Sequence, residues 1–221
     1  MTDKYVQHRF KSAVRNHKMT IEQDDGVFRC INFSAPDTSI YQFRLTTWPG
    51  HLAISGDLDD FIFTRLRDMF DFFRFAGPDY TRTDYPNYDY WAEKTQAVSK
   101  HGALTSFCEN LYVKAIRRDM SQHVSGMALS DARECVIDAR IDDLFYPPHD
   151  TREAISRAQD WRCPITGNHP FGEFWDHRLE DYSFGFKFAC HAVQWGIKQY
   201  DLQRQGRDQV AHDKLVLAGE L

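Results

Sequence analysis

The alternation of apolar and polar residues between positions 19 and 64 constrains the fold of this chain more than any other feature. The expected strands share a period of two and are residues 19–23, 27–33, 40–47, 52–55 and 61–63. The first two flank an Asp-Gly turn at Asp25 and Gly26, which is a strong hairpin signal. The connections are too short for parallel crossovers, so the sequence predicts an antiparallel sheet of four to five strands.

The pattern becomes helical after this sheet. Leu66, Met69, Phe70 and Phe73 form an apolar stripe suited to one face of the sheet. The other expected helices are residues 3–17, 91–100, 106–121, 130–145, 150–161 and 182–203. The last of these is apolar over most of its circumference, which places it in the interior.

These elements predict an α+β fold in which the N-terminal antiparallel sheet packs against helices. Residues 1–102 plus 181–203 are expected to form the sheet-and-helix core, which includes a largely buried C-terminal helix. Residues 103–180 are expected to be a helical elaboration of this core. Residues 204–221 form a polar tail.

Composition and charge exclude several classes of protein. The 221 residues are 42% hydrophobic and 27% charged, as in a globular protein, and the net charge is −5. Residues 1–100 carry 13 Lys/Arg against 14 Asp/Glu, and residues 101–221 carry 14 against 18, so neither half is a basic nucleic-acid footprint. No apolar run approaches the roughly 20 residues of a membrane span, and the N-terminus lacks an apolar signal core. We therefore expect a cytoplasmic protein that does not bind membranes.

The five cysteines indicate reduced thiols. They are odd in number, far apart and never arranged as C-x-x-C, which argues against a disulfide framework and against a zinc site. The sequence also contains no P-loop, no G-x-G-x-x-G, no H-E-x-x-H and no G-x-S-x-G motif. We therefore expect no metal and no cofactor, and an enzyme is less expected than a binding protein.

One group of residues could nevertheless carry catalysis. His51, Asp57, Asp59 and Asp60 lie close together in the sequence. Crowded carboxylates can hold Mg²⁺, and a nearby histidine can carry a proton, so these residues are the weak candidates for a metal-dependent hydrolase acting on nucleotides or nucleic acid. The alternative, which we favour, is that Gly56 to Asp60 forms a solvated turn.

Two further groups are candidates for binding a partner. The aromatic group and its arginine comprise Tyr80, Arg82, Tyr85, Tyr88, Tyr90 and Trp91, and such side chains dominate protein interfaces. The overall acidic balance favours a protein partner over nucleic acid, although these aromatics could equally cap the core. Glu134, Asp138 and Asp142 recur at intervals of four and could face a basic partner, or form a solvated helix face.

Several segments of the chain resemble a family of uncharacterised accessory proteins of bacteriophages, prophages and plasmids. The resemblance is carried by residues 24–29 (DDGVFR), 48–57 (WPGHLAISGD), 68–74 (DMFDFFR), 90–94 (YWAEK) and 190–201 (CHAVQWGIKQYD). It implies a small protein, in the cytoplasm of a bacterial host, that inhibits a host defence system by stoichiometric binding, for example as an anti-CRISPR factor. The expected partner is a defence protein or ribonucleoprotein, and homodimerisation and sequestration of a signalling nucleotide are further alternatives.

Overall fold

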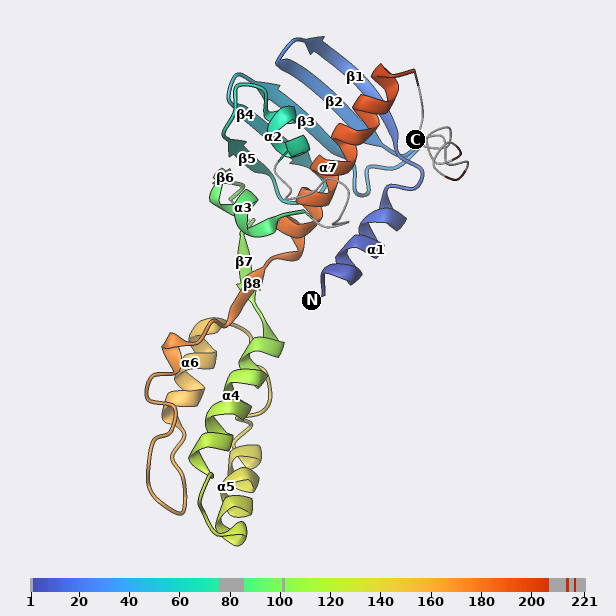
Figure 1. Ribbon diagram of the computed structural model, residues 1–221. Coiled ribbons are helices and arrows are strands. Elements are labelled where there is room, and N and C mark those ends of the chain that lie inside the picture. The colour runs from blue at the N-terminus through green and yellow to red at the C-terminus, as the bar shows by residue number, and fades with distance from the viewer. Residues whose placement is uncertain (1, 76–85, 101, 207–213, 215–216, 218–221) are drawn as a thin grey trace. The chain divides into compact units, whose positions relative to one another are not determined.

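The structure is a computed structural model that describes residues 2–75, 86–100, 102–206, 214 and 217. The chain divides into two compact units (Figure 1). Unit 1 contains residues 1–104 and 182–221, and unit 2 contains residues 105–181. Unit 2 is therefore an insertion into unit 1, with boundaries close to those expected from the sequence.

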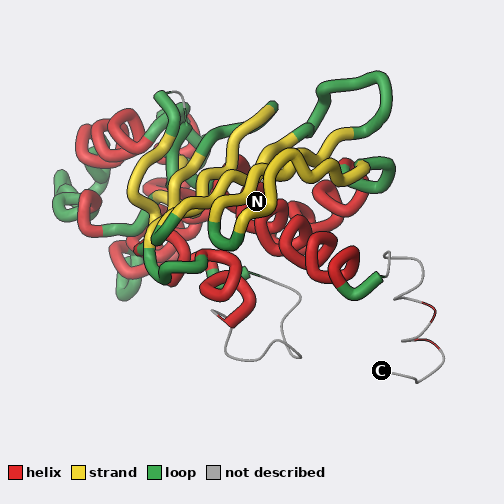
Figure 2. The backbone as a smooth tube through the Cα atoms, turned by 90° about the horizontal axis from the view of Figure 1, so that it is seen from above, coloured by secondary structure: helices red, strands yellow, loops and turns green. Residues whose placement is uncertain are grey.

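Unit 1 is built on a six-stranded antiparallel sheet in which the strands are neighbours in sequence order (Figure 1). Figure 2 shows the strands in yellow, seen from above. The strands are β1 (Lys18–Asp25), β2 (Phe28–Ser34), β3 (Phe43–Trp48), β4 (His51–Gly56), β5 (Phe61–Thr64) and β6 (Thr95–Val98). Asp25 pairs with Phe28 across the first turn, where Gly26 has a φ of 59°. The hairpin that the Asp-Gly signal predicts is thus confirmed.

Buried and exposed side chains alternate along the central strands, so one face of the sheet forms the core. The helices of this unit are α1 (Asp3–Ala13), α2 (Met69–Phe75), α3 (Tyr88–Glu93) and α7 (Phe184–Arg204). Helix α7 runs across the sheet (Figure 1) and buries residues over most of its circumference, as its sequence predicts. Gly196 permits this close approach, because a Cβ atom there would lie 2.9 Å from Leu45 Cδ1.

One predicted element of unit 1 is wrong in type. The helix expected over residues 91–100 ends at Glu93, and Thr95–Val98 instead forms β6. This strand pairs with β5, which would otherwise be the edge of the sheet. Tertiary pairing therefore overrides the local helical pattern and raises the number of strands from the expected four or five to six.

Unit 2 has a helical core of its own. Its elements are the strand β7 (Thr105–Phe107), helices α4 (Glu109–His123), α5 (Leu129–Ile141) and α6 (Thr151–Asp160), the 3₁₀ helix η1 (Phe174–Asp176) and the strand β8 (Glu180–Tyr182). The two short strands pair where the chain enters and leaves the unit. Asp150 caps α6 by accepting a hydrogen bond from the Glu153 N–H (2.8 Å). A search of the described residues found no helix with the length and hydropathy needed to cross a bilayer.

Candidate functional site

Two carboxylates of the predicted hydrolase site accept hydrogen bonds from backbone N–H groups. Asp57 accepts a hydrogen bond from the Tyr41 N–H (2.7 Å), and Asp60 accepts one from the Gly56 N–H (3.2 Å). Within the described part of the chain, His51, Asp57, Asp59 and Asp60 do not converge as potential metal ligands. The His51 ring stacks on Trp48 at 5.0 Å, and its Nδ1 lies 3.0 Å from the Pro49 carbonyl oxygen. The geometry therefore matches the alternative reading of this segment, a turn.

The members of the predicted aromatic group that the structure describes pack in or against the core of unit 1. Tyr80, Arg82 and Tyr85 lie outside the described residues. Trp91 is only 2% exposed and packs edge-to-face on Phe73 at 4.6 Å. Tyr88 is also buried, with its hydroxyl 3.0 Å from His191 Nε2.

Tyr90 is half-buried between Phe72 and the ammonium group of Lys94, which lies 4.9 Å from the centre of its ring. The placement of Tyr88 and Trp91 corrects the expectation of an exposed platform, because their rings fill space under the sheet. The positions of these three side chains match the alternative expectation, that the aromatics cap the core.

The three acidic residues of α5 do not share one environment. Glu134 and Asp142 are exposed, whereas Asp138 is half-buried and accepts a hydrogen bond from Trp161 Nε1 (3.1 Å). Asp138 therefore holds a core tryptophan in place. Glu134 and Asp142 remain available to a partner in solution.

Helix α5 also exposes large apolar side chains, a feature that the sequence reading did not identify. Leu129 is 69% exposed, Ile137 57% and Ile141 74%; these three residues are called the α5 surface below. On the helical wheel, Ile137 and Ile141 lie side by side between Arg133 and Glu134, and Arg133 separates them from Leu129. The continuous apolar centre of the α5 surface is therefore Ile137 and Ile141, with charged residues at its edges.

Unit 2 carries the whole net charge of the protein. It contains 14 of the 32 Asp/Glu residues and 9 of the 27 Lys/Arg residues, which gives −5, while unit 1 is balanced. A surface depression of about 450 Å³ begins at Asp142, directly after the α5 surface, and is lined by Asp142, Leu144, Glu153, Ser156, Arg157, Asp160 and Trp161. It is lined by three carboxylates and one guanidinium, and this excess of negative charge favours the binding of a basic group from a partner.

Two buried thiols and an imidazole meet in the core of unit 2. His123 ends α4, Cys135 lies within α5, and Cys163 follows α6. The sulfurs of Cys135 and Cys163 are 3.0 Å apart, and one potential ligand atom from each of the three residues lies within 4.8 Å of the others. Together they are called the thiol–imidazole cluster. They are the described residues able to hold a metal ion as a group of three.

The two thiols of this cluster have opposite acidities. Burial raises the pKa of Cys163, but its contacts with Cys135, with the Thr166 side chain and backbone, and with His123 outweigh burial and lower the pKa below its ordinary value. Burial and the neighbouring Cys163 raise the pKa of Cys135. The two sulfurs therefore lie in contact but differ in the direction of their pKa shifts.

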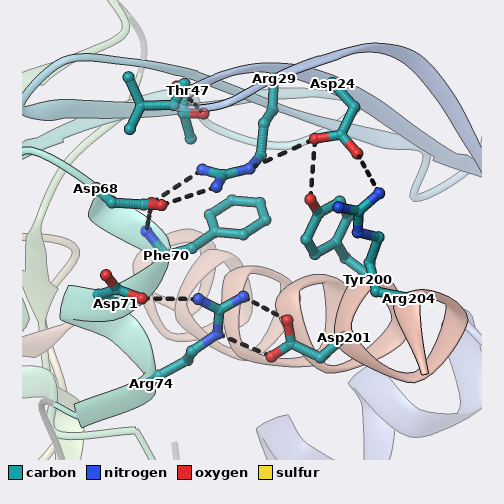
Figure 3. Close-up of polar contacts among 11 residues, drawn as sticks. Asp24, Arg29, Thr47, Asp68, Phe70, Asp71, Arg74, Tyr200, Asp201 and Arg204 are labelled. Carbon is teal, nitrogen blue, oxygen red and sulfur yellow. Dashed lines mark hydrogen bonds and ion pairs between the residues drawn. The ribbon is translucent and has the colours of Figure 1, made fainter.

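A network of ion pairs in unit 1 joins three of the segments that carry the family resemblance (Figure 3). Arg29 on β2 makes two hydrogen bonds to Asp68, of 2.9 and 2.7 Å. Arg74 on α2 pairs with Asp71 and with Asp201 on α7, and the Phe70 ring lies within 6 Å of both guanidinium groups. These charges satisfy one another, so the network is structural.

Comparisons with protein-family models, with curated proteins and with solved structures found no match to this chain. Its function is therefore inferred from the residues and geometry described above.

Proposed function

We propose that this protein binds a basic host protein through unit 2 and has no catalytic role. In the setting that the family resemblance implies, the partner is a component of a bacterial defence complex, and stoichiometric binding inhibits it. The observation that carries the proposal is the α5 surface. Its three large apolar side chains are exposed and do not belong to the core of their own unit, and exposed apolar residues grouped on one helix are typical of protein–protein contacts.

The apolar centre supplies the binding energy in this proposal. Burying Ile137 and Ile141 against a partner removes two aliphatic side chains from water, which contributes about 1.5–3 kcal/mol for each side chain that is fully exposed beforehand. The charged neighbours Arg133 and Glu134 would form the rim of such a contact. Interfaces between proteins commonly have this arrangement of apolar core and polar rim.

The charge of unit 2 selects the class of partner. A net charge of −5 on this unit attracts basic surfaces, and the depression beside Asp142 suits an arginine or lysine side chain. Proteins that bind nucleic acids carry such basic surfaces. A nucleic-acid-binding subunit of a ribonucleoprotein therefore fits unit 2 better than a neutral protein does.

The two alternative functions have less support from the geometry. A hydrolase would need the carboxylates of residues 57–60 to converge, but Asp57 and Asp60 instead accept hydrogen bonds from two different backbone N–H groups, those of Tyr41 and Gly56. A nucleotide sponge would need a large aromatic pocket. The cavity lined by Tyr41, Phe43 and Phe188 has a volume of about 10 Å³, which is enough for at most one water molecule. The depressions of about 420 and 410 Å³ that include Phe33 or Phe171 are lined mostly by polar and charged side chains.

The test is affinity capture from extracts of bacteria that carry active defence systems. The bait is the full chain, either unchanged or with Ile137→Asp and Ile141→Asp together, and captured proteins are quantified by mass spectrometry. We expect the double variant to lose a basic partner that the unchanged chain retains. The added aspartates make unit 2 more acidic, so weaker attraction to a basic protein cannot explain such a loss.

The matched control is Ile40→Asp, which changes an equally exposed isoleucine in unit 1. This variant should retain the partner, and binding of the unchanged chain should weaken as salt rises. Equal capture by the double variant and the unchanged chain would rule out the α5 surface. If only Ile40→Asp lost the partner, the contact would lie in unit 1 and not on the α5 surface.

A further inference from the structure

We propose that His123, Cys135 and Cys163 bind one zinc ion, which ties together the three helical segments of unit 2. The residues come from the end of α4, the middle of α5 and the loop after α6. An ion held by all three would cross-link these segments in the core. This inference does not rest on the proposed function.

The distances in the cluster suit a shared ion. Zinc lies about 2.3 Å from a cysteine sulfur and about 2.0–2.1 Å from a histidine nitrogen, so ligands around one tetrahedral ion are roughly 3.3–3.8 Å apart. The two sulfurs are 3.0 Å apart, and all three ligand atoms lie within 4.8 Å of one another. Shifts of about 1 Å or less would therefore bring the three residues to zinc-binding distances.

The chemistry of the donors favours a thiophilic ion. Two thiolates and one imidazole are ligands that zinc prefers, and both cysteines are almost fully buried. His123 Nε2 is also shielded from solvent and, within the described residues, has no hydrogen-bond partner. A buried nitrogen of this kind is costly unless something binds it, and one nitrogen of the same ring lies within 4.8 Å of both sulfurs.

The loop after α6 is shaped to hold a thiolate. The Cys163 N–H donates to the Asn168 carbonyl oxygen (3.0 Å), and the Gly167 N–H donates to the Cys163 carbonyl oxygen (2.8 Å). Gly167 has a φ of 69°, which closes this tight turn at no steric cost. The turn brings the Thr166 backbone close enough to the Cys163 sulfur to contribute to its lowered pKa.

Charge and protons balance when the ion binds. Zinc forms bonds to both sulfurs and to one imidazole nitrogen, and the thiol protons that it displaces are released to solvent. Two thiolates neutralise the double charge of the ion.

The experiment measures zinc bound to the full chain, purified and kept under reducing conditions. After dialysis against zinc and removal of the excess, we expect one zinc per chain by elemental mass spectrometry. Cys135→Ser and Cys163→Ser should each reduce this to background, and His123→Asn should weaken the affinity by more than about tenfold. The matched controls, Cys108→Ser and His149→Gln in the same unit, should keep one zinc per chain.

A second measurement covers variants that fail to fold. Co²⁺ titrated into the unchanged chain should produce the thiolate-to-metal absorption of a cysteine-bound cobalt ion, and zinc should abolish it. Absence of this absorption, or equal zinc content in the unchanged chain and all the variants, would overturn the proposal. A Cys135–Cys163 disulfide that forms under reducing conditions with zinc present would also overturn it, by showing that the cluster is a redox pair.

Discussion

His191 shows how burial changes the chemistry of one side chain. It lies on α7 and is 4% exposed, with its ring stacked on Phe10 at 5.7 Å and its Nε2 3.0 Å from the Tyr88 hydroxyl. Burial lowers its pKa to about 4, with a smaller opposing effect of Asp3 and a supporting one of Lys11. The folded protein therefore keeps this imidazole neutral at pH values where an exposed histidine is charged.

This burial predicts a pH-dependent stability. Below its ordinary pKa of about 6.5, His191 binds a proton in the unfolded chain but not in the folded chain. The free energy of unfolding should therefore fall as the pH is lowered from about 6.5 towards 4, by about 3 kcal/mol over the whole interval. Urea denaturation at a series of pH values measures this effect.

The variant His191→Gln should flatten this dependence, whereas His8→Gln, at an exposed position of α1, should leave it unchanged. A slope that survives His191→Gln would assign the dependence to other groups. Asp68 is distinguishable, because its pKa is lowered and its contribution is lost only at more acidic pH.

Single residues also show why the thiol–imidazole cluster could not be predicted. Cys135 and Cys163 are 28 residues apart, and no short metal-binding spacing links them with His123. Their meeting depends on how α4, α5 and the loop after α6 pack, which the local pattern does not specify. All five cysteines are free thiols in the structure, as the sequence predicts, but Cys135 and Cys163 lie together, which the sequence did not indicate.

At the scale of elements, the ion-pair network joins the first hairpin, α2 and α7. Asp68 has two roles, because it pairs with Arg29 and its Oδ1 accepts a hydrogen bond from the Phe70 N–H (2.9 Å). Burial alone would raise the pKa of Asp68, but the hydrogen bonds from Arg29 and Phe70 lower it. The carboxylate therefore stays ionised at a lower pH than a free aspartate does.

Asp68→Ala should destabilise unit 1 strongly. It leaves the buried Arg29 guanidinium without its bidentate partner, which typically costs about 3–5 kcal/mol. Asp71→Ala, which removes a half-exposed partner of Arg74, should cost less than about 1 kcal/mol. Urea unfolding at neutral pH compares the two variants, and equal losses would show that the Arg29 pair does not anchor the hairpin to α2.

Elements with strong local signals were predictable, and those that depend on a partner were not. The Asp-Gly hairpin and the largely apolar α7 follow from turn chemistry and from the helical wheel. Strand β6 does not, because Thr95–Val98 becomes a strand only by pairing with β5. The aromatic side chains of α3 could equally cover a core or face a partner, and packing under the sheet decides for the core.

At the scale of the whole molecule, the described residues form two hydrophobic cores, one in each unit. The core of unit 1 includes Ile31, and that of unit 2 includes Ile116. Each core is held by side chains of its own unit, so a cavity in one core should weaken mainly that unit.

Ile116→Ala should therefore destabilise unit 2 by about 2–5 kcal/mol and increase its amide hydrogen exchange. Exchange in β2 and β3 should remain close to that of the unchanged chain. Ile31→Ala should show the reverse pattern, and hydrogen exchange with mass spectrometry measures both. An equal rise across the two units in either variant would mean that they unfold together.

The places where the chain passes between the units have an evolutionary consequence. The two ends of unit 2 are neighbours, because the Cys108 N–H donates to the Leu179 carbonyl oxygen (2.8 Å). The two places where unit 1 is interrupted are also neighbours, because the Ser183 N–H donates to the Leu104 carbonyl oxygen (2.9 Å). A gene segment encoding residues 105–181 can thus be exchanged for an unrelated one without stretching the sheet. One recombination event would then give a lineage a new helical unit on an inherited scaffold.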